Sequence, residues 1–394
     1  MSWKETCAMD ERLGFVGAYV AGEESISVLC RQYGISRKTG HKWLARYSLE
    51  GAAGLAERSS APRRPGNAIS AAVRSEILSL RRRHPHWGPR KLLARLMLER
   101  PGVSWPAAST VGDLLRREGL VRPRRRRDPY PRYGGPFTRC TAPNDVWCAD
   151  FKGWFATGSG LRCNPLTVTD AHSRYLLCCR HVDRPDVEHV RPIFEALFAR
   201  HGLPRAILTD NGPPFASKGV LGLSELSVWW VKLGIRPQRI EPGKPQQNGR
   251  HERMHRTLKA ETASPPAATI AGQQRRFERF LASYNDVRPH EALGQRVPSV
   301  VYRNSKRVYP GAAVEPLYPP AFAVRRLNAY GVLNWGGRQV LVGQALAGEL
   351  VGLAETSTGN WLLRFADIDL GIIDRRTGKL DRRKEARPSL FTAA

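Results

Sequence analysis

Apolar residues recur at helical spacing within the first 60 residues of the chain. The positions that carry this repeat are Ile26, Leu29, Cys30, Trp43 and Leu44. Gly34 interrupts the repeat where a tight turn fits, and Ser36 is a residue type that caps helix N-termini. Residues 1–60 therefore have the outline of a helix-turn-helix unit, although a plain helical hairpin has the same spacing.

The helical spacing returns in residues 69–121, after a linker rich in proline and arginine at 61–68. The helices of this block are marked by Val73, Ile77, Leu80, Leu92, Leu93, Leu96, Met97, Val111, Leu114 and Leu115. Pro89 suits the first turn of the middle helix, and Gly119 ends the last one. The sequence thus predicts two helix-turn-helix units in tandem.

From 140 to 305 short apolar runs alternate with a helical repeat, which is typical of an α/β domain. The strand-like runs cover 146–151, 166–169, 175–181 and 206–208. The helix that follows Pro185 and ends at Gly202 is marked by Val187, Val190, Phe194, Leu197 and Phe198. This order of elements predicts a mixed sheet that contains one crossover connection.

The last part of the chain alternates short apolar and polar stretches separated by glycines. A proline-rich connection at 306–320 leads into this pattern, which covers 321–375 and predicts a small all-β barrel or sandwich. A basic tail follows at 376–394.

The net charge of the chain indicates the kind of molecule that it binds. The chain has 63 Lys and Arg residues against 35 Asp and Glu residues, a net charge of +28. A surplus of this size indicates a polyanionic partner such as double-stranded DNA. The segment 122–139 contains a run of arginines that is either a solvated linker or a phosphate contact, namely Arg124, Arg125, Arg126 and Arg127.

Other features of the composition exclude a membrane or secreted role. No apolar run approaches the length of a spanning helix, and the first twenty residues lack an apolar signal region. The seven cysteines are odd in number and form no C-x-x-C pair, so we expect reduced thiols rather than disulfides or a cysteine zinc site. These features favour a cytoplasmic protein.

Two aspartates stand where catalytic acids are found in α/β domains. Asp150 lies in the apolar run 146–151, where strand alternation puts it on the face of Cys148 and opposite Trp147 and Phe151. Asp210 ends the next apolar strand, before an Asn-Gly turn. If these strands are neighbours, the two carboxylates converge, and a cation between them relieves their repulsion.

Glu252 is the third acid of interest. It follows a turn-rich stretch and begins a helix that also carries basic residues, so an ordinary ion-pair surface is an alternative interpretation. The same segment, from His251 to His255, matches H-E-x-x-H, a zinc-protease pattern that the flanking bases disfavour. Hard oxygen ligands from two aspartates and a glutamate instead suit Mg²⁺ or Mn²⁺, which perform in-line displacement at phosphorus as a pair.

The motifs around these acids resemble the integrase catalytic core of bacterial insertion-sequence transposases and retroviral integrases. The matching stretches are 145–150, 208–215 and 245–253, followed by Tyr284-Asn285 and by Arg288-Pro289-His290 with Leu293. The resemblance is specific over 140–305. One departure is a longer stretch between Asp210 and Glu252, whose extra length we place at 219–230, so that Glu241 and Glu225 compete for the third position.

The resemblance implies a multidomain protein with N-terminal all-α helix-turn-helix units, a ribonuclease-H-like α/β core and a small all-β SH3-like domain. It implies a catalytic and metal-binding triad of Asp150, Asp210 and Glu252 with two Mg²⁺ or Mn²⁺ ions. It also implies cleavage at element ends and joining of the 3′ hydroxyl to target DNA, by at least a dimer, in a bacterial cell near the nucleoid.

Several other residues complete the set of candidates. The candidates for DNA contact are Arg37, Lys38, His41, Lys42, Thr110, Arg116, Arg124, Arg125, Arg126, Arg127, Lys244, Arg250, Arg253, Arg256 and Lys259. We expect Asp170 to support a hairpin through Ser173 or Arg174, and Asp145 to begin a strand. Two alternatives stay open: a DNA-binding regulator with an inactive core, and a metal-dependent nuclease without strand transfer.

Overall fold

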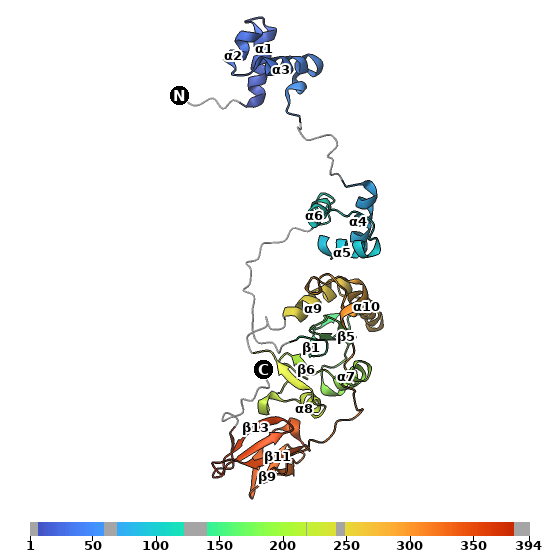
Figure 1. Cartoon of the computed structure of the whole chain (residues 1–394), viewed down its shortest axis with the longest axis vertical. Coiled ribbons are helices and arrows are strands. Elements are labelled where there is room, and N and C mark those ends of the chain that lie inside the picture. The colour runs from blue at the N-terminus through green and yellow to red at the C-terminus, as the bar shows by residue number, and fades with distance from the viewer. Residues whose placement is uncertain (1–6, 59–68, 122–139, 218, 242–248, 382–394) are drawn as a thin grey trace. The chain divides into compact units, whose positions relative to one another are not determined.

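The computed structural model describes residues 7–58, 69–121, 140–217, 219–241 and 249–381. The chain divides into two compact units, Met1–Ser70 and Ala71–Ala394. Figure 1 shows helices alone in the first unit and in the beginning of the second. None of the described helices is long and apolar enough to cross a membrane.

The first unit is a small bundle of helices α1 (Ala8–Val20), α2 (Ile26–Gln32) and α3 (Arg37–Glu50) and the short helix η1 (Gly51–Leu55). Its core consists of Phe15, Val16, Leu29, Cys30, Trp43 and Leu55. Gly34 has a φ of +62° at the turn between α2 and α3, and the Ser36 hydroxyl accepts a hydrogen bond from the Thr39 backbone N–H at 3.2 Å. The predicted helix-turn-helix of 1–60 is therefore confirmed in its turn and its cap.

The second helical block consists of α4 (Ala71–Arg83), α5 (Pro89–Glu99) and α6 (Ala108–Arg117). The predicted apolar positions that are buried are Ile77, Leu80, Leu92, Leu93, Leu96, Val111, Leu114 and Leu115. The sequence places Met97 on this face too, but Met97 is 50% exposed, because it lies one position past Leu96 and so turns away from the buried stripe. Trp87, which has no periodic signal in the sequence, is fully buried and stacks on His84.

A five-stranded mixed sheet forms the centre of the second unit. Its strands are β1 (Val146–Phe151), β4 (Pro165–Asp170), β5 (Leu176–His181), β6 (Ala206–Thr209) and β7 (Arg236–Arg239), in the order β5-β4-β1-β6-β7. The pairs β1–β4 and β4–β5 are antiparallel, whereas β1–β6 and β6–β7 are parallel. The predicted mixed sheet is confirmed; the sequence does not predict strand β7 or the small hairpin of β2 (Phe155–Ala156) and β3 (Arg162–Cys163).

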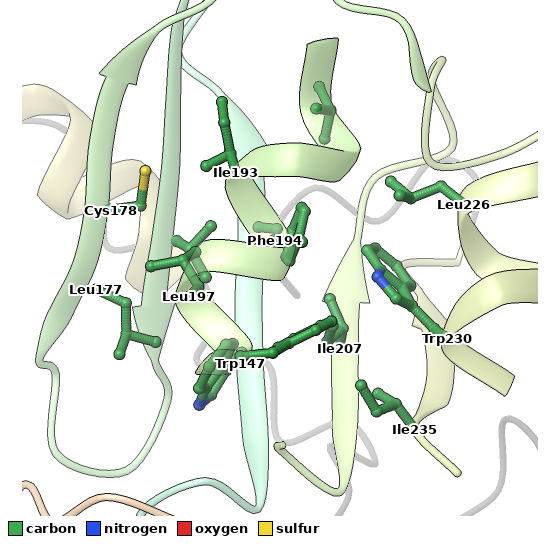
Figure 2. Close-up of a cluster of buried hydrophobic side chains, with 14 of the residues drawn as sticks. Trp147, Leu177, Cys178, Ile193, Phe194, Leu197, Ile207, Leu226, Trp230 and Ile235 are labelled. Atoms are coloured by element: carbon green, nitrogen blue, oxygen red, sulfur yellow. The ribbon is translucent and has the colours of Figure 1, made fainter. Parts of the chain in front are cut away.

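Helices cover both faces of this sheet. On one face Trp147 and Ile207 pack against Phe194 and Leu197 of α7 (Val187–His201) and Trp230 of α8 (Glu225–Lys232) (Figure 2). The other face packs against α9 (Gly249–Thr262) and α10 (Ile270–Ala282) through Cys179, Met254, Leu258, Phe277 and Phe280. Asp150 belongs to this second face, as strand alternation predicts, because its neighbours Val146 and Cys148 lie there.

The segment after α10 closes the edge of the sheet at β5. It contains the π-helical turn η4 (Ser283–Val287), the short helix η5 (Glu291–Leu293) and α11 (Pro298–Val301). The Asn285 side chain accepts a hydrogen bond from the Leu176 backbone N–H at 2.8 Å and donates one to the Leu176 carbonyl at 2.9 Å. Asn285 thus satisfies backbone groups that an edge strand leaves unpaired.

The C-terminal region is an antiparallel β structure. Its elements are β8 (Ala323–Arg326), β9 (Val332–Trp335), β10 (Arg338–Leu341), η6 (Gln344–Leu346), β11 (Leu350–Glu355), β12 (Trp361–Phe365), β13 (Ile368–Ile373) and β14 (Leu380–Asp381). One sheet has the order β14-β13-β12-β11-β8, and β9 pairs with β10. Strand β14 lies beyond residue 375, where the sequence predicts a basic tail.

The stretch 219–230 joins the core to the β region. The short helix η2 (Val220–Gly222) and helix α8 contribute Val220, Leu223 and Val228 to a buried cluster with Leu333 and Phe365. Leu226, Trp229 and Trp230 of the same stretch belong instead to the core of the mixed sheet. The stretch in which the sequence places the extra length therefore lies where two hydrophobic cores meet.

We predict that Asn285→Ala lowers the free energy of unfolding by about 2–4 kcal/mol, because both Leu176 backbone groups lose their partner in a buried place. The measurement is urea unfolding of the full chain followed by tryptophan fluorescence. Asp286→Ala, at an exposed neighbouring position, is the control and stays within about 0.5 kcal/mol. Equal stability of the two variants would refute this role of Asn285.

Candidate active site

The parallel pairing of β1 with β6 sets two of the predicted acids at equivalent positions along neighbouring strands. Cys148 pairs with Leu208; Asp150 lies two residues later in β1, and Asp210 lies two residues later, directly after the end of β6. Paired residues of parallel neighbours point to the same face, and Cys148 and Leu208 share a buried cluster there. Asp150 and Asp210 therefore lie at the carboxyl end of adjacent strands, on the same face of the sheet.

The turn after β6 holds Asp210 in place. The Gly212 backbone N–H donates a hydrogen bond to the Asp210 carboxylate at 3.2 Å. The Asn211 side chain donates to the Ile240 carbonyl at 2.9 Å, which ties the turn to the end of β7. A Cβ at position 212 would lie 3.1 Å from an Asp210 carboxylate oxygen, so glycine allows this close approach.

Helix α9 is anchored on β4, the other neighbour of β1. The Nε2 atoms of His251 and His255 each lie 2.7 Å from the Thr167 hydroxyl oxygen, and Nδ1 of His251 lies 3.1 Å from the Thr169 hydroxyl. Thr167 pairs with Asp150 in the sheet register. The helix therefore crosses the sheet at the level of the first catalytic candidate.

Burial keeps both histidines uncharged. Their exposed fractions are 2% and 6%. Desolvation lowers the pKa of His251 to about 3 and that of His255 to about 2, and for His255 the charges of His251 and Lys152 act in the same direction. Neutral imidazoles are thus part of this site at any physiological pH.

The position of Glu252 follows from the turn of the helix. Successive residues of an α-helix are about 100° apart, so Glu252 lies on the flank of α9 next to His255. Met254 and Glu261 lie on the opposite flank, where Glu261 forms an ion pair with Arg288 at 2.8 Å. Glu252 is exposed on its flank of α9.

Glu241, which competes for the role of third acid, directly follows Ile240 beyond the end of β7. Thr209 pairs with Arg239, and Ile240 packs with Cys148 and Leu208 on the Asp150 face. If the alternation of β7 continued past its end, it would direct the Glu241 side chain to the opposite face. Glu225, the other competitor, is an exposed residue in the first turn of α8.

The potential metal ligands gather in a different set from the three acids. Within the described ranges, the group with three ligand atoms mutually closer than 4.8 Å is Asp150, His251 and His255. Asp210 and Glu252 do not belong to it, so the three acids are not drawn together to that distance. Asp150 is the residue that the two sets share.

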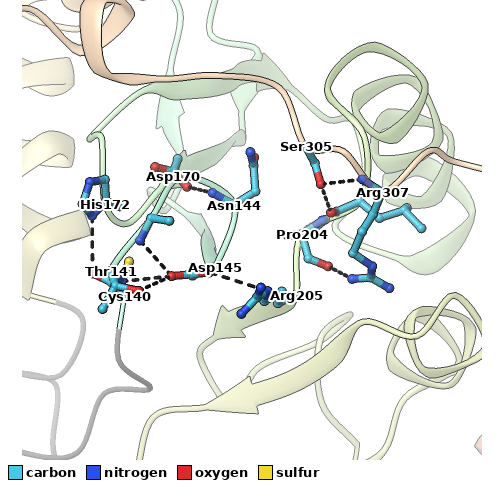
Figure 3. A network of polar contacts seen from close by, with 12 residues as sticks. Cys140, Thr141, Asn144, Asp145, Asp170, His172, Pro204, Arg205, Ser305 and Arg307 are labelled. Atoms are coloured by element: carbon cyan, nitrogen blue, oxygen red, sulfur yellow. Dashed lines mark hydrogen bonds and ion pairs between the residues drawn. The ribbon is translucent and has the colours of Figure 1, made fainter.

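The remaining acids of this region have structural partners (Figure 3). Asp170 accepts a hydrogen bond from the Asn144 N–H at 2.7 Å. It also accepts hydrogen bonds from the Ser173 N–H and hydroxyl at 2.7 and 2.6 Å. Burial raises the pKa of Asp170, and these bonds oppose that rise. Asp145 accepts hydrogen bonds from Thr141 and Ala142 immediately before β1. Both observations confirm the expected hairpin and strand-start roles.

Most candidates for DNA contact lie on exposed surfaces. In the described segments the exposed ones are Arg37, Lys38, His41, Lys42, Thr110, Arg116, Arg250, Arg253, Arg256 and Lys259. Lys42 lies over the Trp43 ring at 4.5 Å, and Arg116 pairs with Asp113 at 2.5 Å. Arg124, Arg125, Arg126, Arg127 and Lys244 fall outside the described residues.

Family models match most of the chain in sequence. Two models described as integrase core domain match residues 141–245 and 233–298. A helix-turn-helix domain matches 11–66, and a homeodomain-like domain matches 39–115.

Relatives are found among insertion elements and retroviruses. An uncharacterized 39.2 kDa protein of insertion element IS476 from Xanthomonas euvesicatoria is 27% identical over 251 residues, which cover 63% of this chain and 69% of that protein. An uncharacterized 31.7 kDa protein of IS407 from Burkholderia multivorans is 29% identical over 235 residues, which cover 59% and 80%. The Gag-Pol polyprotein of baboon endogenous virus is 30% identical over 176 residues, which cover 44% of this chain and 10% of that polyprotein.

Among solved structures, the HTLV-2 integrase catalytic core domain in complex with magnesium matches with 16% identity and a TM-score of 0.33, covering 42% of this chain and all of that one. The helix-turn-helix and integrase-core matches agree with the helical units and the mixed sheet described above. Together with the insertion-element relatives, they identify an integrase core domain within residues 141–298 and support an insertion-sequence transposase of the retroviral integrase superfamily.

Proposed function

We propose that this chain cuts DNA at the ends of its insertion sequence and joins the freed 3′ hydroxyl to target DNA. The observation that supports the proposal is the register of the adjacent parallel strands that carry Asp150 and precede Asp210, with α9, the helix of Glu252, anchored on the neighbouring strand β4. Carboxyl ends of adjacent strands are where α/β sheets hold their reacting groups. Asp150, Asp210 and Glu252 are the proposed catalytic residues.

The donor set fits Mg²⁺ or Mn²⁺. Carboxylate oxygens are the ligands that these ions take in proteins, and Asp150, Asp210 and Glu252 are the residues that hold them in this proposal. When bound, a pair of such ions would supply activation of an attacking oxygen and stabilisation of a leaving oxygen in an in-line displacement. The sheet register sets the two aspartates at the carboxyl ends of adjacent strands, and α9 carries the glutamate that the proposal assigns to the same ions.

The flank of α9 that carries Glu252 also carries bases for the DNA backbone. Arg256 and Lys259 lie on that flank by helical spacing, and both are exposed. Basic side chains beside the acids place a phosphate near the reacting groups without reading its sequence. Arg250 and Arg253, in the first turn of the same helix, extend this surface.

The helix-turn-helix units provide the sequence recognition. In α3 the exposed residues Arg37, Lys38, His41 and Lys42 lie in the N-terminal half of the second helix of the motif, the part that enters a major groove in such domains. In the second unit, the proposal assigns DNA contact to Thr110 in the first turn of α6 and to Arg116 in its last turn. Two tethered readers bind a terminal inverted repeat more tightly than either alone.

The proposed reaction determines the minimum oligomeric state of the protein and its location in the cell. Two element ends are held at once, so the active form is at least a dimer. The substrate is chromosomal DNA, so the protein acts beside the nucleoid in the bacterial cytoplasm.

We predict that Asp210→Asn and Glu252→Gln each reduce strand cleavage and joining by about a thousandfold or more, because several kcal/mol of transition-state stabilisation depends on the metal ligands. Glu241→Gln, which removes the charge of the competing acid, keeps activity within about threefold, a change of less than 1 kcal/mol. The assay uses labelled DNA carrying the element ends in Mg²⁺, with DNA binding measured in parallel.

Loss of activity in Glu241→Gln with full activity in Glu252→Gln would transfer the third role to Glu241. A second arm of the assay supplies ends that are already cut. Joining of these ends distinguishes a transposase from a nuclease without strand transfer, and a wild-type protein that neither cuts nor joins is a DNA-binding regulator.

We predict that the double variant Lys38→Ala with Lys42→Ala weakens binding to the terminal repeat and lowers the slope of log K against log salt. The slope falls by about 0.9 for each DNA phosphate that the variant no longer neutralises. Arg31→Ala, on the preceding helix, changes neither quantity. The measurement is fluorescence anisotropy with repeat DNA at several salt concentrations. An unchanged slope in the double variant would remove α3 from the DNA interface.

A further inference from the structure

The Thr167 hydroxyl makes an unusual number of contacts for one side chain. It donates a hydrogen bond to the Asp150 backbone carbonyl at 3.0 Å, and the Nε2 atoms of His251 and His255 both lie 2.7 Å from its oxygen. All three side chains are buried or nearly so, with Thr167 at 0% exposure. One hydroxyl therefore connects the strand of Asp150 with the helix of Glu252.

Only one arrangement of protons satisfies these contacts. A hydroxyl has one proton to donate and two lone pairs to accept with. Because Thr167 donates to the Asp150 carbonyl, both imidazoles donate their Nε2–H to the Thr167 oxygen. Nδ1 of His251 then has no proton and accepts from the Thr169 hydroxyl at 3.1 Å. Both threonine hydroxyls and both Nε2 atoms thus have partners in this network.

The network also decides between two roles for the histidine pair. Two histidines four residues apart on a helix have their rings on the same face. Such a pair can bind a metal ion or share one hydrogen-bond partner. In this structure the Nε2 atom of each ring is hydrogen bonded to the Thr167 oxygen. A metal ion bound through these atoms would break both hydrogen bonds and displace the hydroxyl from between the rings.

We propose that His251 and His255, through Thr167, are positioning residues that fix α9 on the strand of Asp150 and so hold Glu252 within reach of the same metal ions. This inference rests on the proposed function, and it names the residues that set the metal affinity of the proposed active site. Glu252 follows His251 directly in the chain, so a helix that slides or rotates at His251 carries the glutamate with it. Residues that orient metal ligands in this way typically change metal affinity about 10- to 100-fold when removed.

The test compares Thr167→Val, which keeps the shape and removes the hydroxyl, with Thr167→Ser, which keeps the hydroxyl. We expect Thr167→Val to weaken Mn²⁺ binding to the full chain by about 10- to 100-fold, measured by electron paramagnetic resonance of the free ion, and to raise the Mg²⁺ concentration for half-maximal joining similarly. The joining rate at saturating Mg²⁺ falls less. Thr167→Ser restores both quantities.

Two further variants separate positioning from general stability. His255→Gln keeps an N–H at the place of Nε2 and is expected to retain most of the Mn²⁺ affinity, whereas His255→Leu loses it. His201→Gln is the matched control, because His201 is also buried but contacts Asn304 at the end of α7. Its thermal stability falls without a change in Mn²⁺ affinity.

Unchanged Mn²⁺ affinity in a folded Thr167→Val protein overturns the proposal. Stoichiometric Zn²⁺ binding by the wild-type chain that both His251→Leu and His255→Leu abolish overturns it as well, because the rings would then be ligands. Failure of the proposed function is distinguishable: the wild-type protein would not join DNA in any divalent metal, whereas Mn²⁺ binding by Thr167→Val is measured without DNA.

Discussion

The parallel pairing of β1 with β6 is the constraint on which the rest of this molecule depends. It sets Cys148 opposite Leu208 and thereby brings Asp150 and Asp210 to the same edge of the sheet. If the register of β1 shifted by one residue, every side chain of the strand would move to the opposite face of the sheet. Asp150 would then be buried in the apolar layer beneath α7, and Trp147 would leave the core for the polar face. The hydrophobic face of the sheet therefore fixes the register, and the register fixes the acids.

The opposite face of the sheet is polar where α9 crosses it. Thr167, Thr169, His251 and His255 replace the apolar packing that Met254 and Leu258 provide further along the same helix. Apolar contacts allow small sliding between helix and sheet, whereas a saturated hydrogen-bond network has one geometry. A hydrogen-bond network of this kind therefore holds a helix that carries a proposed metal ligand in one position. The segment after α10 is fixed in the same way, because the Asn285 side chain makes two hydrogen bonds to the backbone of Leu176 in the edge strand.

The sequence predicts those features that local rules decide. Alternation in 146–151 gives the face of Asp150, and the Ser36 cap and Gly34 turn give the first helix-turn-helix. Strand β7 could not be predicted from Arg236-Pro237-Gln238-Arg239, because only its pairing with β6 makes it a strand. The H-E-x-x-H pattern shows that two rings share a helix face, but their partner Thr167 lies far away in sequence, so the contact emerges only in the fold.

The most direct test of the central claim is the anomalous scattering of Mn²⁺ in a crystal of the chain bound to DNA carrying an element end. The account predicts two Mn²⁺ peaks ligated by Asp150, Asp210 and Glu252, with His251 and His255 still hydrogen bonded to Thr167. Mn²⁺ bound to Asp150 and the two imidazoles, with Asp210 and Glu252 out of reach of the same ions, would contradict it.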